Sequence, residues 1–347
     1  MGLGTRALVL GVLVAGVAGG GGPVAWAQAD PPGCTRTAQG TGERIECTEG
    51  VPAGITLRGT DGDDEIVITG RDGADTPRYG ERGGVGNAGT VDSGEGVDTI
   101  TITGGTGGNA LDYTLEDGDR PADFRGGNGG HGNTGSIITG GGTTTVTITG
   151  GRGRDTAFEG GRGGQGGDGW AATNATLSTT GTLNMTITGG DGGNGGPVDT
   201  STTLGGGGDG GDGIAANSRL TVTGSSPVGA TLTALGGNGG DGATLGERVR
   251  PGGVGGSGAA QVSQTTMTPN NDVVIAGAGT PGSPAPSTIR EFSLIGARVD
   301  ARDGDDSVIT MDRTQSSTVV CGRGNNDTYL YETDPASRRG CETVGRQ

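Results

Sequence analysis

The sequence contains no lysine and only one histidine, His131. The absence of lysine excludes Schiff-base catalysis, a Ser-Lys catalytic pair and a phosphate-binding Walker loop. A single histidine excludes the His-Glu-x-x-His zinc motif and every metal site built from several imidazoles. A Ser-His-Asp triad remains arithmetically possible, but His131 lies in a glycine stretch and is expected to be an exposed loop residue. The inventory of residues therefore argues against most catalytic sites.

Aromatic residues are also scarce, at 3% of the chain, whereas glycine supplies 84 of the 347 residues. The usual share of glycine is about 7%. A conventional globular core would therefore lack bulk, and Trp170 is expected to pack at a repeat boundary. Glycine loses more backbone entropy on folding than any other residue, so an ordered structure needs dense, repeated hydrogen bonding to offset that loss.

Long apolar runs are missing beyond the first residues. Arg6 precedes the short apolar segment 7–15, and Ala-x-Ala cleavage sites follow at 25–27 and 27–29. Glycines and a proline interrupt the run before it reaches the roughly 18 apolar residues that a membrane span requires. We predict a signal peptide at residues 1–29 and a secreted, extracellular protein without a membrane span.

The four cysteines form two local pairs, Cys34 with Cys47 and Cys321 with Cys341. In an exported chain each pair can close a short loop near one end. Spacings of 13 and 20 residues fit a four-thiolate zinc site poorly, because such sites use Cys-x2-Cys pairs. We predict two disulfides, each of which stabilises the fold by roughly 2–4 kcal/mol.

A repeated unit is visible where threonine-rich segments precede glycine. Segments 99–105 (TITITGG), 145–151 (TVTITGG), 185–190 (MTITGG) and 220–224 (LTVTG) share one template. Its alternation of apolar residues with threonine is typical of a strand with one buried face. The units follow one another at 46, 39 and 35 residues. This pattern predicts an all-β protein, a parallel β-solenoid of the β-roll or β-helix kind, with insertions.

Runs of Gly-Gly-x triplets lie between these segments, for example 160–168 (GGRGGQGGD) and 236–241 (GGNGGD). Collagen is excluded because the triplets are brief and proline is nearly absent from the x places. They could be flexible linkers. They could instead be extended strands with three residues per turn, packed as closely as only glycine allows. Their regular placement between strands favours the ordered alternative.

The mature chain divides into four zones on this basis. An N-terminal cap with calcium-type turns covers residues 30–104, and the glycine-rich repeats cover 105–270. A proline-rich link at 271–295 leads to a C-terminal calcium-type cap at 296–347. Terminal repeats of solenoids are usually atypical, because they shield the open ends.

Acidic turns match the calcium-binding nonapeptide G-G-x-G-x-D-x-U-x, where U is a large apolar residue. Segment 150–158 (GGRGRDTAF) contains all three glycines and the aspartate, and segments 59–67, 93–100 and 301–308 match over the later positions, whereas 70–75 is a weaker copy. Calcium needs six to eight oxygens, so two stacked turns must share one ion. The candidate ligands are Asp61, Asp63, Asp64, Asp75, Asp98, Asp155, Asp303, Asp305 and Asp306.

These turns resemble those of secreted hemolysin-type, or RTX-like, calcium-binding repeat proteins, especially the disulfide-containing actinobacterial members. The resemblance covers roughly residues 54–104 and 296–347 with one turn between, and is closest at 299–308 (VDARDGDDSV) and 320–324 (VCGRG). It implies a parallel β-roll in which calcium bridges adjacent turns. The chain departs from the pattern, since Asp64 and Asp75 are 11 residues apart and Asn326 takes the place of the last aspartate. We therefore expect one to three sites of modest affinity.

The net charge of −16 favours cations over nucleic acid as partners. We expect a non-catalytic calcium-binding protein with a structural, adhesive or surface-binding role, whose partners include calcium ions and an extracellular polysaccharide or cell-surface component. The alternative is a calcium-dependent carbohydrate-active enzyme, a lyase or epimerase, on a parallel β-helix. A third hypothesis reads the Thr-x-Thr rows as an ice-binding or other flat recognition face, although threonine also favours strands for its own reasons.

Overall fold

The structure is a computed structural model. It describes residues 30–111, 124–158, 160–197, 205–224, 229–245, 248–260, 263–268, 272–283, 292–295, 297–302, 304–311, 313–315, 317–331 and 337–346. The predicted signal peptide lies outside these residues. Within the described residues, no helical segment has the length and hydropathy of a membrane span.

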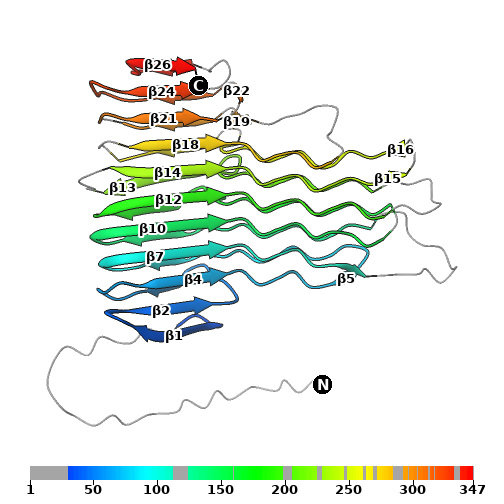
Figure 1. Cartoon of the computed structure of the whole chain (residues 1–347). Helices are drawn as coiled ribbons and strands as arrows, with labels where there is room; N and C mark the ends of the chain where they lie inside the picture. The colour runs from blue at the N-terminus through cyan, green and yellow to red at the C-terminus, as the bar shows by residue number, and fades with distance from the viewer. Residues whose placement is uncertain are drawn as a thin grey trace, which may run out of the picture.

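The chain winds in a solenoid-like manner and builds two large parallel sheets that face each other across the core (Figure 1). The long sheet contains eleven strands. In their order in the sheet they are β1 (Cys34–Gln39), β2 (Gly42–Cys47), β4 (Glu65–Thr69), β7 (Gly96–Thr103), β10 (Gly142–Thr149), β12 (Thr182–Thr188), β14 (Ala230–Leu235), β18 (Val273–Gly277), β21 (Ser307–Thr310), β24 (Thr328–Tyr331) and β26 (Thr343–Arg346).

The short sheet contains nine strands. They are β3 (Thr56–Arg58), β6 (Thr90–Asp92), β9 (Ser136–Thr139), β11 (Thr176–Thr179), β13 (Arg219–Gly224), β17 (Gln264–Thr266), β20 (Arg298–Asp300), β23 (Thr318–Val320) and β25 (Ser337–Arg339). Three small pairs complete the described strands: β5 (Thr76–Pro77) with β8 (Ala110–Leu111), β15 (Thr244–Leu245) with β16 (Arg248–Val249), and β19 (Phe292–Ile295) with β22 (Arg313–Gln315).

Strand neighbours in both large sheets are parallel, with one exception at the amino-terminal end. There β1 and β2 form an antiparallel hairpin that the Cys34–Cys47 disulfide closes. Near the other end a second disulfide joins Cys321 to Cys341. Both predicted disulfides are therefore confirmed.

The core between the sheets is a narrow stack of aliphatic side chains. The period-two alternation predicted for the threonine-rich segments is present, because Ile100, Ile102, Val146 and Ile148 are fully buried. Each such side chain contributes roughly 1.5–3 kcal/mol by leaving water. Trp170 is the largest fully buried residue, and its indole N–H donates to the carbonyl oxygen of Arg219 at 3.0 Å. The expectation that Trp170 packs between repeats is thus confirmed.

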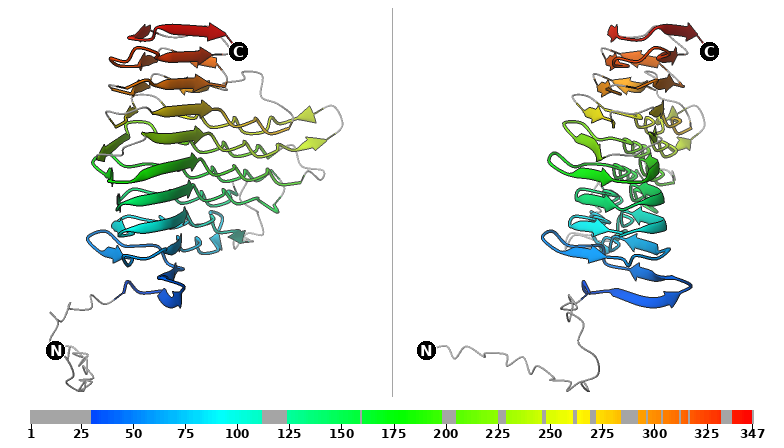
Figure 2. Two further views of the ribbon diagram at one scale, coloured as in Figure 1. Left: turned by 60° about the vertical axis from the view of Figure 1, so that its left-hand side comes forward. Right: turned by 90° about the vertical axis from the view of Figure 1, so that its left-hand side faces the viewer.

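The glycine-rich segments form an ordered layered extension of the sheets, which we call the glycine blade (Figures 1 and 2). Its outgoing segments follow the strands of the long sheet, as at 104–109 and 189–196, and its returning segments run back toward the core, as at 126–132 and 161–169. Hydrogen bonds zigzag between the two layers, from Gly105 N to Gly84 O and from Gly130 N to Gly105 O, each 2.8 Å. The described triplets are therefore extended segments held by hydrogen bonds and close packing, not linkers.

Each Gly-Gly-x triplet of the blade has three N–H groups, and triplet 107–109 shows where they go. The N–H of Gly107 donates to the carbonyl of Arg152 in the next coil at 3.0 Å, and that of Gly108 donates across the layers to Glu81 O at 2.8 Å. The N–H of Asn109 donates to the carboxylate of Asp75 in the previous coil at 2.6 Å. An acidic or amide side chain at the x place therefore satisfies a backbone donor that would otherwise lack a protein partner.

Both glycines of a triplet are required by close packing. A Cβ atom on Gly129 would lie 1.8 Å from the carbonyl oxygen of Gly151, and one on Gly130 would lie 1.9 Å from that of Gly84. The x side chains point away from these contacts. The blade therefore tolerates side chains at every third residue only.

Two features of the repeat differ from the sequence-based expectation. The segment 220–224 belongs to β13 of the short sheet, and the fourth equivalent strand of the long sheet is β14, which pairs with β12 from Leu183↔Ala230 to Thr188↔Leu235. Segment 220–224 matched the template because both sheets bury alternate residues. The long sheet has strands in all four predicted zones and the short sheet in three of them, and the blade begins at Gly70, within residues 30–104.

A glycine substitution tests this packing. We expect Gly129→Ala to lower the free energy of unfolding by about 1–3 kcal/mol or more, because the new methyl group overlaps a backbone carbonyl that cannot move alone. Gly206→Ala is the matched control, since the nearest atom to its Cβ is 3.7 Å away. Thermal unfolding followed by circular dichroism measures both, and equal melting temperatures would contradict the packing described.

Candidate functional site

Buried aspartates stack at the turns that lead into the long sheet, and we call them the turn column. Its members lie just before or at the start of β4, β7, β18, β21 and β24, and each is at most 3% exposed. They are Asp64, Asp98, Asp272, Asp306 and Asp327. In the coil after Asp98 the equivalent position is Thr144, so the column is interrupted in the middle of the molecule.

Each aspartate of the turn column accepts a hydrogen bond from the backbone of the preceding coil. The N–H of Asp64 donates to Asp98 Oδ1 at 3.0 Å, that of Asp272 to Asp306 Oδ1 at 2.7 Å, and that of Asp306 to Asp327 Oδ1 at 2.9 Å. Hydrogen bonds to an ionised acceptor are about twice as strong as neutral ones. The column therefore ties successive coils together.

The second carboxylate oxygen is left without a partner at three positions. Among the described residues, Asp98 Oδ2, Asp272 Oδ2 and Asp306 Oδ2 are buried and have no hydrogen-bond partner at good geometry, although Ser93 lies near the Asp98 carboxylate and Thr268 near that of Asp272. Burial raises the pKa of Asp272 to about 6. Burial, together with the nearby charges of Asp272 and Asp327, raises the pKa of Asp306 to about 7. These oxygens need either a proton or a cation near neutral pH.

Most of the predicted calcium ligands in the turns lie in or beside the turn column. Asp64, Asp98 and Asp306 are members of it. Asp63 accepts a hydrogen bond from Val97 N at 2.9 Å, Asp305 accepts one from Asn325 N at 3.0 Å, and Asp61 is exposed on the same turn. Asp303 lies outside the described residues.

Two predicted ligands lie elsewhere, on the blade beyond the far ends of the strands. Asp75 accepts a hydrogen bond from Asn109 N, and Asp155 accepts one from Asn194 N at 2.7 Å and pairs with Arg152 at 2.8 Å. The structure does not bring them to the turns, because the glycines around them belong to blade triplets.

Sequence reasoning missed Asp272 and left Asp327 out of the ligand set. The signal was an aspartate directly before a β-branched strand, as in Asp272-Val273-Val274, without the glycines of the nonapeptide. Within the described residues, no three His, Cys, Asp or Glu side chains converge in a way that could hold a metal ion. A cation at the turn column would therefore take carboxylate oxygens from two coils and its other oxygens from backbone carbonyls and water.

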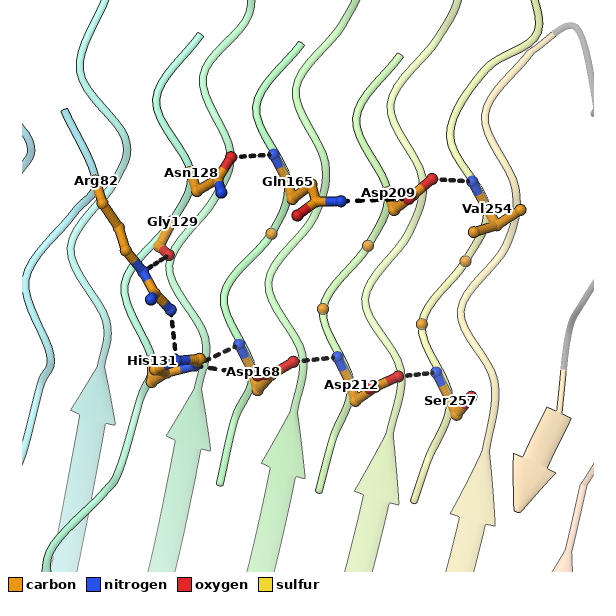
Figure 3. A pocket seen from close by; sticks show the side chains of 15 residues that line it. Arg82, Asn128, Gly129, His131, Gln165, Asp168, Asp209, Asp212, Val254 and Ser257 are labelled. Carbon is orange, nitrogen blue, oxygen red and sulfur yellow. Dashed lines mark hydrogen bonds and ion pairs between the residues drawn. The ribbon is translucent and has the colours of Figure 1, made fainter. Parts of the chain in front are cut away.

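A second polar site lies on the returning face of the blade (Figure 3). Two rows of x side chains enclose a depression of about 460 Å³. One row is Asn128, Gln165, Asp209 and Val254, and the other is His131, Asp168, Asp212 and Ser257. The rows repeat the ladder of the blade, since Asp168 Oδ1 accepts from Asp212 N at 2.9 Å and Asp212 Oδ1 accepts from Ser257 N at 2.8 Å.

His131 is held in this depression between two charged side chains. Its Nδ1 lies 3.1 Å from Asp168 Oδ2, and its Nε2 contacts the guanidinium of Arg82. The backbone N–H of Asp168 donates to Nδ1 at 3.2 Å, and a guanidinium can only donate, so each ring nitrogen faces a donor and Nδ1 also lies beside the Asp168 carboxylate. The expectation of an exposed loop residue was wrong: the side chain is only 23% exposed, because the glycine stretch around it is a packed blade strand.

The depression makes stability depend on pH. Burial, and secondarily the charge of Asp168, raises the pKa of Asp212 to about 7. The folded state then binds more protons than the unfolded state between about pH 4 and 7, so stability falls as pH rises through that window, by roughly 1.4 kcal/mol per pKa unit of the shift.

We expect Asp212→Asn to flatten this pH dependence and to raise the melting temperature at pH 8, because the amide oxygen can still accept from Ser257 N. Melting temperatures at pH 5 and pH 8 measure the effect. Asp209→Asn removes an equal charge from the neighbouring row and controls for net charge. An unchanged pH profile in Asp212→Asn would show that this carboxyl does not titrate in the window.

Comparison with known proteins returned no match: no family model fits the sequence, and no curated protein or solved structure is significantly similar to it.

Proposed function

We propose that the chain is a secreted, non-catalytic, calcium-binding repeat protein with a structural or surface-binding role, built as a β-solenoid of the β-roll kind. The observation that carries the proposal is the pair of unpartnered buried oxygens, Asp272 Oδ2 and Asp306 Oδ2, on two adjacent coils. Calcium prefers carboxylate and carbonyl oxygens and accepts irregular geometry, so such a pair is a suitable start for a shared site.

The charges around the pair support a cation rather than two protons. Asp305 and Asp327 both contribute repulsion at Asp306. A divalent ion would offset this repulsion and would coordinate both unpartnered oxygens, Asp272 Oδ2 and Asp306 Oδ2. Asp98 offers an equivalent oxygen at the amino-terminal end of the column, beside Asp63 and Asp64. We therefore propose one calcium site at each end of the turn column, within the one to three expected.

A non-catalytic role fits the way in which the polar side chains are used. In the depression of the blade, carboxylates accept backbone N–H groups of the next coil, and the side-chain hydrogen bonds of His131 among the described residues are with Arg82 and Asp168. The two disulfides suit an oxidising extracellular compartment. The rows of polar x side chains would then be the surface offered to an extracellular polysaccharide or a cell-surface component.

The carbohydrate-active alternative has one observation in its favour, the contact of Arg82, His131 and Asp168 within a depression. An arginine, an imidazole and a carboxylate can bind and deprotonate a uronate. Release of unsaturated or reducing sugars from a panel of polysaccharides, lost in His131→Ala, would replace the non-catalytic proposal with this one.

Calcium titration tests the main proposal. A site with Kd of about 10⁻⁴–10⁻³ M adds about 1.4 kcal/mol of stability at tenfold excess calcium. We expect the melting temperature to rise between chelator and millimolar calcium at pH 7.5. Asp306→Asn should remove much of this rise without destabilising the protein in chelator, because its amide oxygen still accepts from Asp272 N.

Asp209→Asn, which removes a carboxylate from the blade, is the control and should keep the full response to calcium. Equal melting temperatures of the wild-type protein in chelator and in calcium would contradict the proposal that calcium binds and stabilises the fold. A calcium response that survives in Asp306→Asn would place the ion elsewhere.

A further inference from the structure

The outer face of the long sheet carries an unusual set of side chains over its four central strands, β7, β10, β12 and β14. Core residues such as Ile100 and Ile102 alternate with threonines that point outward, where they are half-buried or exposed. We call these outward threonines the threonine array. Its members are Thr99, Thr101, Thr103, Thr145, Thr147, Thr149, Thr186, Thr188, Thr231 and Thr233.

Parallel pairing places these threonines in straight files across the strands. Thr101 pairs with Thr147, which pairs with Thr186, which pairs with Thr233. A second file joins Thr103, Thr149 and Thr188 in the same way. Neighbouring strands are about 4.8 Å apart, and alternate residues along a strand are about 6.6 Å apart. The hydroxyl groups therefore form a two-dimensional lattice.

The array is uncharged, although the chain is 18% charged. Apart from the glycines that begin β7 and β10, the other outward residues on these four strands are Val97, Thr143, Thr182, Asn184 and Leu235, and none of them is charged. Strand propensity alone does not account for this composition, because β2 and β4 of the same sheet present Arg44, Glu46 and Glu65 on the same face. The change of composition within one sheet points to a use for the central face.

The array is also preorganised. Threonine is β-branched, so its χ1 angle has few accessible values and its methyl and hydroxyl groups keep fixed directions. Among the described residues no protein group takes up the array hydroxyls by a hydrogen bond, so they are available to water. The strands beneath them are stacked nearly parallel to one another in both views of Figure 2. Water bound to such a surface would adopt the spacing of the lattice.

We propose that the threonine array binds ice. A ligand that matches the threonine array must be flat, uncharged and periodic in two directions over four coils. Ordinary protein surfaces do not have this combination of properties. Charge complementarity favours a neutral lattice of water over any ionic partner. A crystalline polysaccharide shares the periodicity, but the array offers no aromatic ring for a sugar to stack on. The methyl groups exclude liquid water while the hydroxyls anchor an ordered layer.

Thermal hysteresis, ice-crystal shaping and partition into a growing ice hemisphere test this proposal on the secreted form of the protein. We expect the wild-type protein to shape ice and to enter it. Thr147→Tyr, at the centre of the array, should lose both activities while its melting temperature is unchanged, because the ring breaks the lattice in the solvent-facing layer. Thr221→Tyr, at an outward position of the short sheet, is the matched control and should retain both.

Exclusion of the wild-type protein from ice would overturn the proposal, and binding to crystalline cellulose or chitin in its place would assign the face to a polysaccharide. Equal ice activity of Thr147→Tyr and wild type would also overturn it, because the activity would then lie on another surface. The ice assays are run both in calcium and in chelator. The calcium proposal is judged by the change in melting temperature between these two conditions, and the ice proposal by ice shaping and ice partition, so the failure of one is distinguished from the failure of the other.

Discussion

The structure depends on one recurring interaction, the hydrogen bond from a backbone N–H in one coil to a side-chain oxygen in a neighbouring coil. In the blade the N–H of Asn109 reaches the carboxylate of Asp75, and at the turns the N–H of Asp272 reaches Asp306. A parallel stack without a bulky core needs a hydrogen-bond partner for every backbone N–H group. Glycine has no side chain, so it cannot supply such a partner. Aspartate and asparagine supply the missing acceptors, which explains their frequency beside glycine.

The same interaction separates two kinds of acidic residue that look alike in the sequence. In the blade, one carboxylate oxygen accepts from the backbone of the next coil, and no aspartate of the described blade residues leaves a fully buried oxygen without a partner. In the turn column, Asp98, Asp272 and Asp306 have a second oxygen that is buried and unpartnered. Among the described residues, only the second kind leaves a buried carboxylate oxygen without a hydrogen-bond partner, which a cation can supply. Calcium chemistry is therefore expected at the ends of the column, where aspartates recur on consecutive coils, and not in the glycine-rich middle, where Thr144 takes the position.

Much of the fold could be predicted from the sequence, because the alternation around Ile100 and Val146 admits only a strand with one buried face. Both disulfides and the buried Trp170 were also predicted correctly. The grouping of segment 220–224 with the threonine-rich strands of the long sheet was wrong, because strands of both sheets bury alternate residues and have the same sequence period. Asp75 and Asp155 satisfied the nonapeptide by composition, and they differ from the turn aspartates in lying among the Gly-Gly-x triplets that follow β4 and β10. Asp272 was missed because its turn contains no glycine.

The small apolar content of the glycine blade has a thermodynamic consequence. The heat capacity change of unfolding comes from newly exposed apolar surface, and exposed peptide groups reduce it. Unfolding of the blade exposes mainly peptide groups, so its contribution per residue should lie below the usual 12–15 cal/mol/K, and its stability curve should be correspondingly flat. A scaffold held by backbone hydrogen bonds rather than by a large apolar core would thus lose little stability on cooling. The hydrophobic effect weakens in the cold, and this scaffold depends on it least.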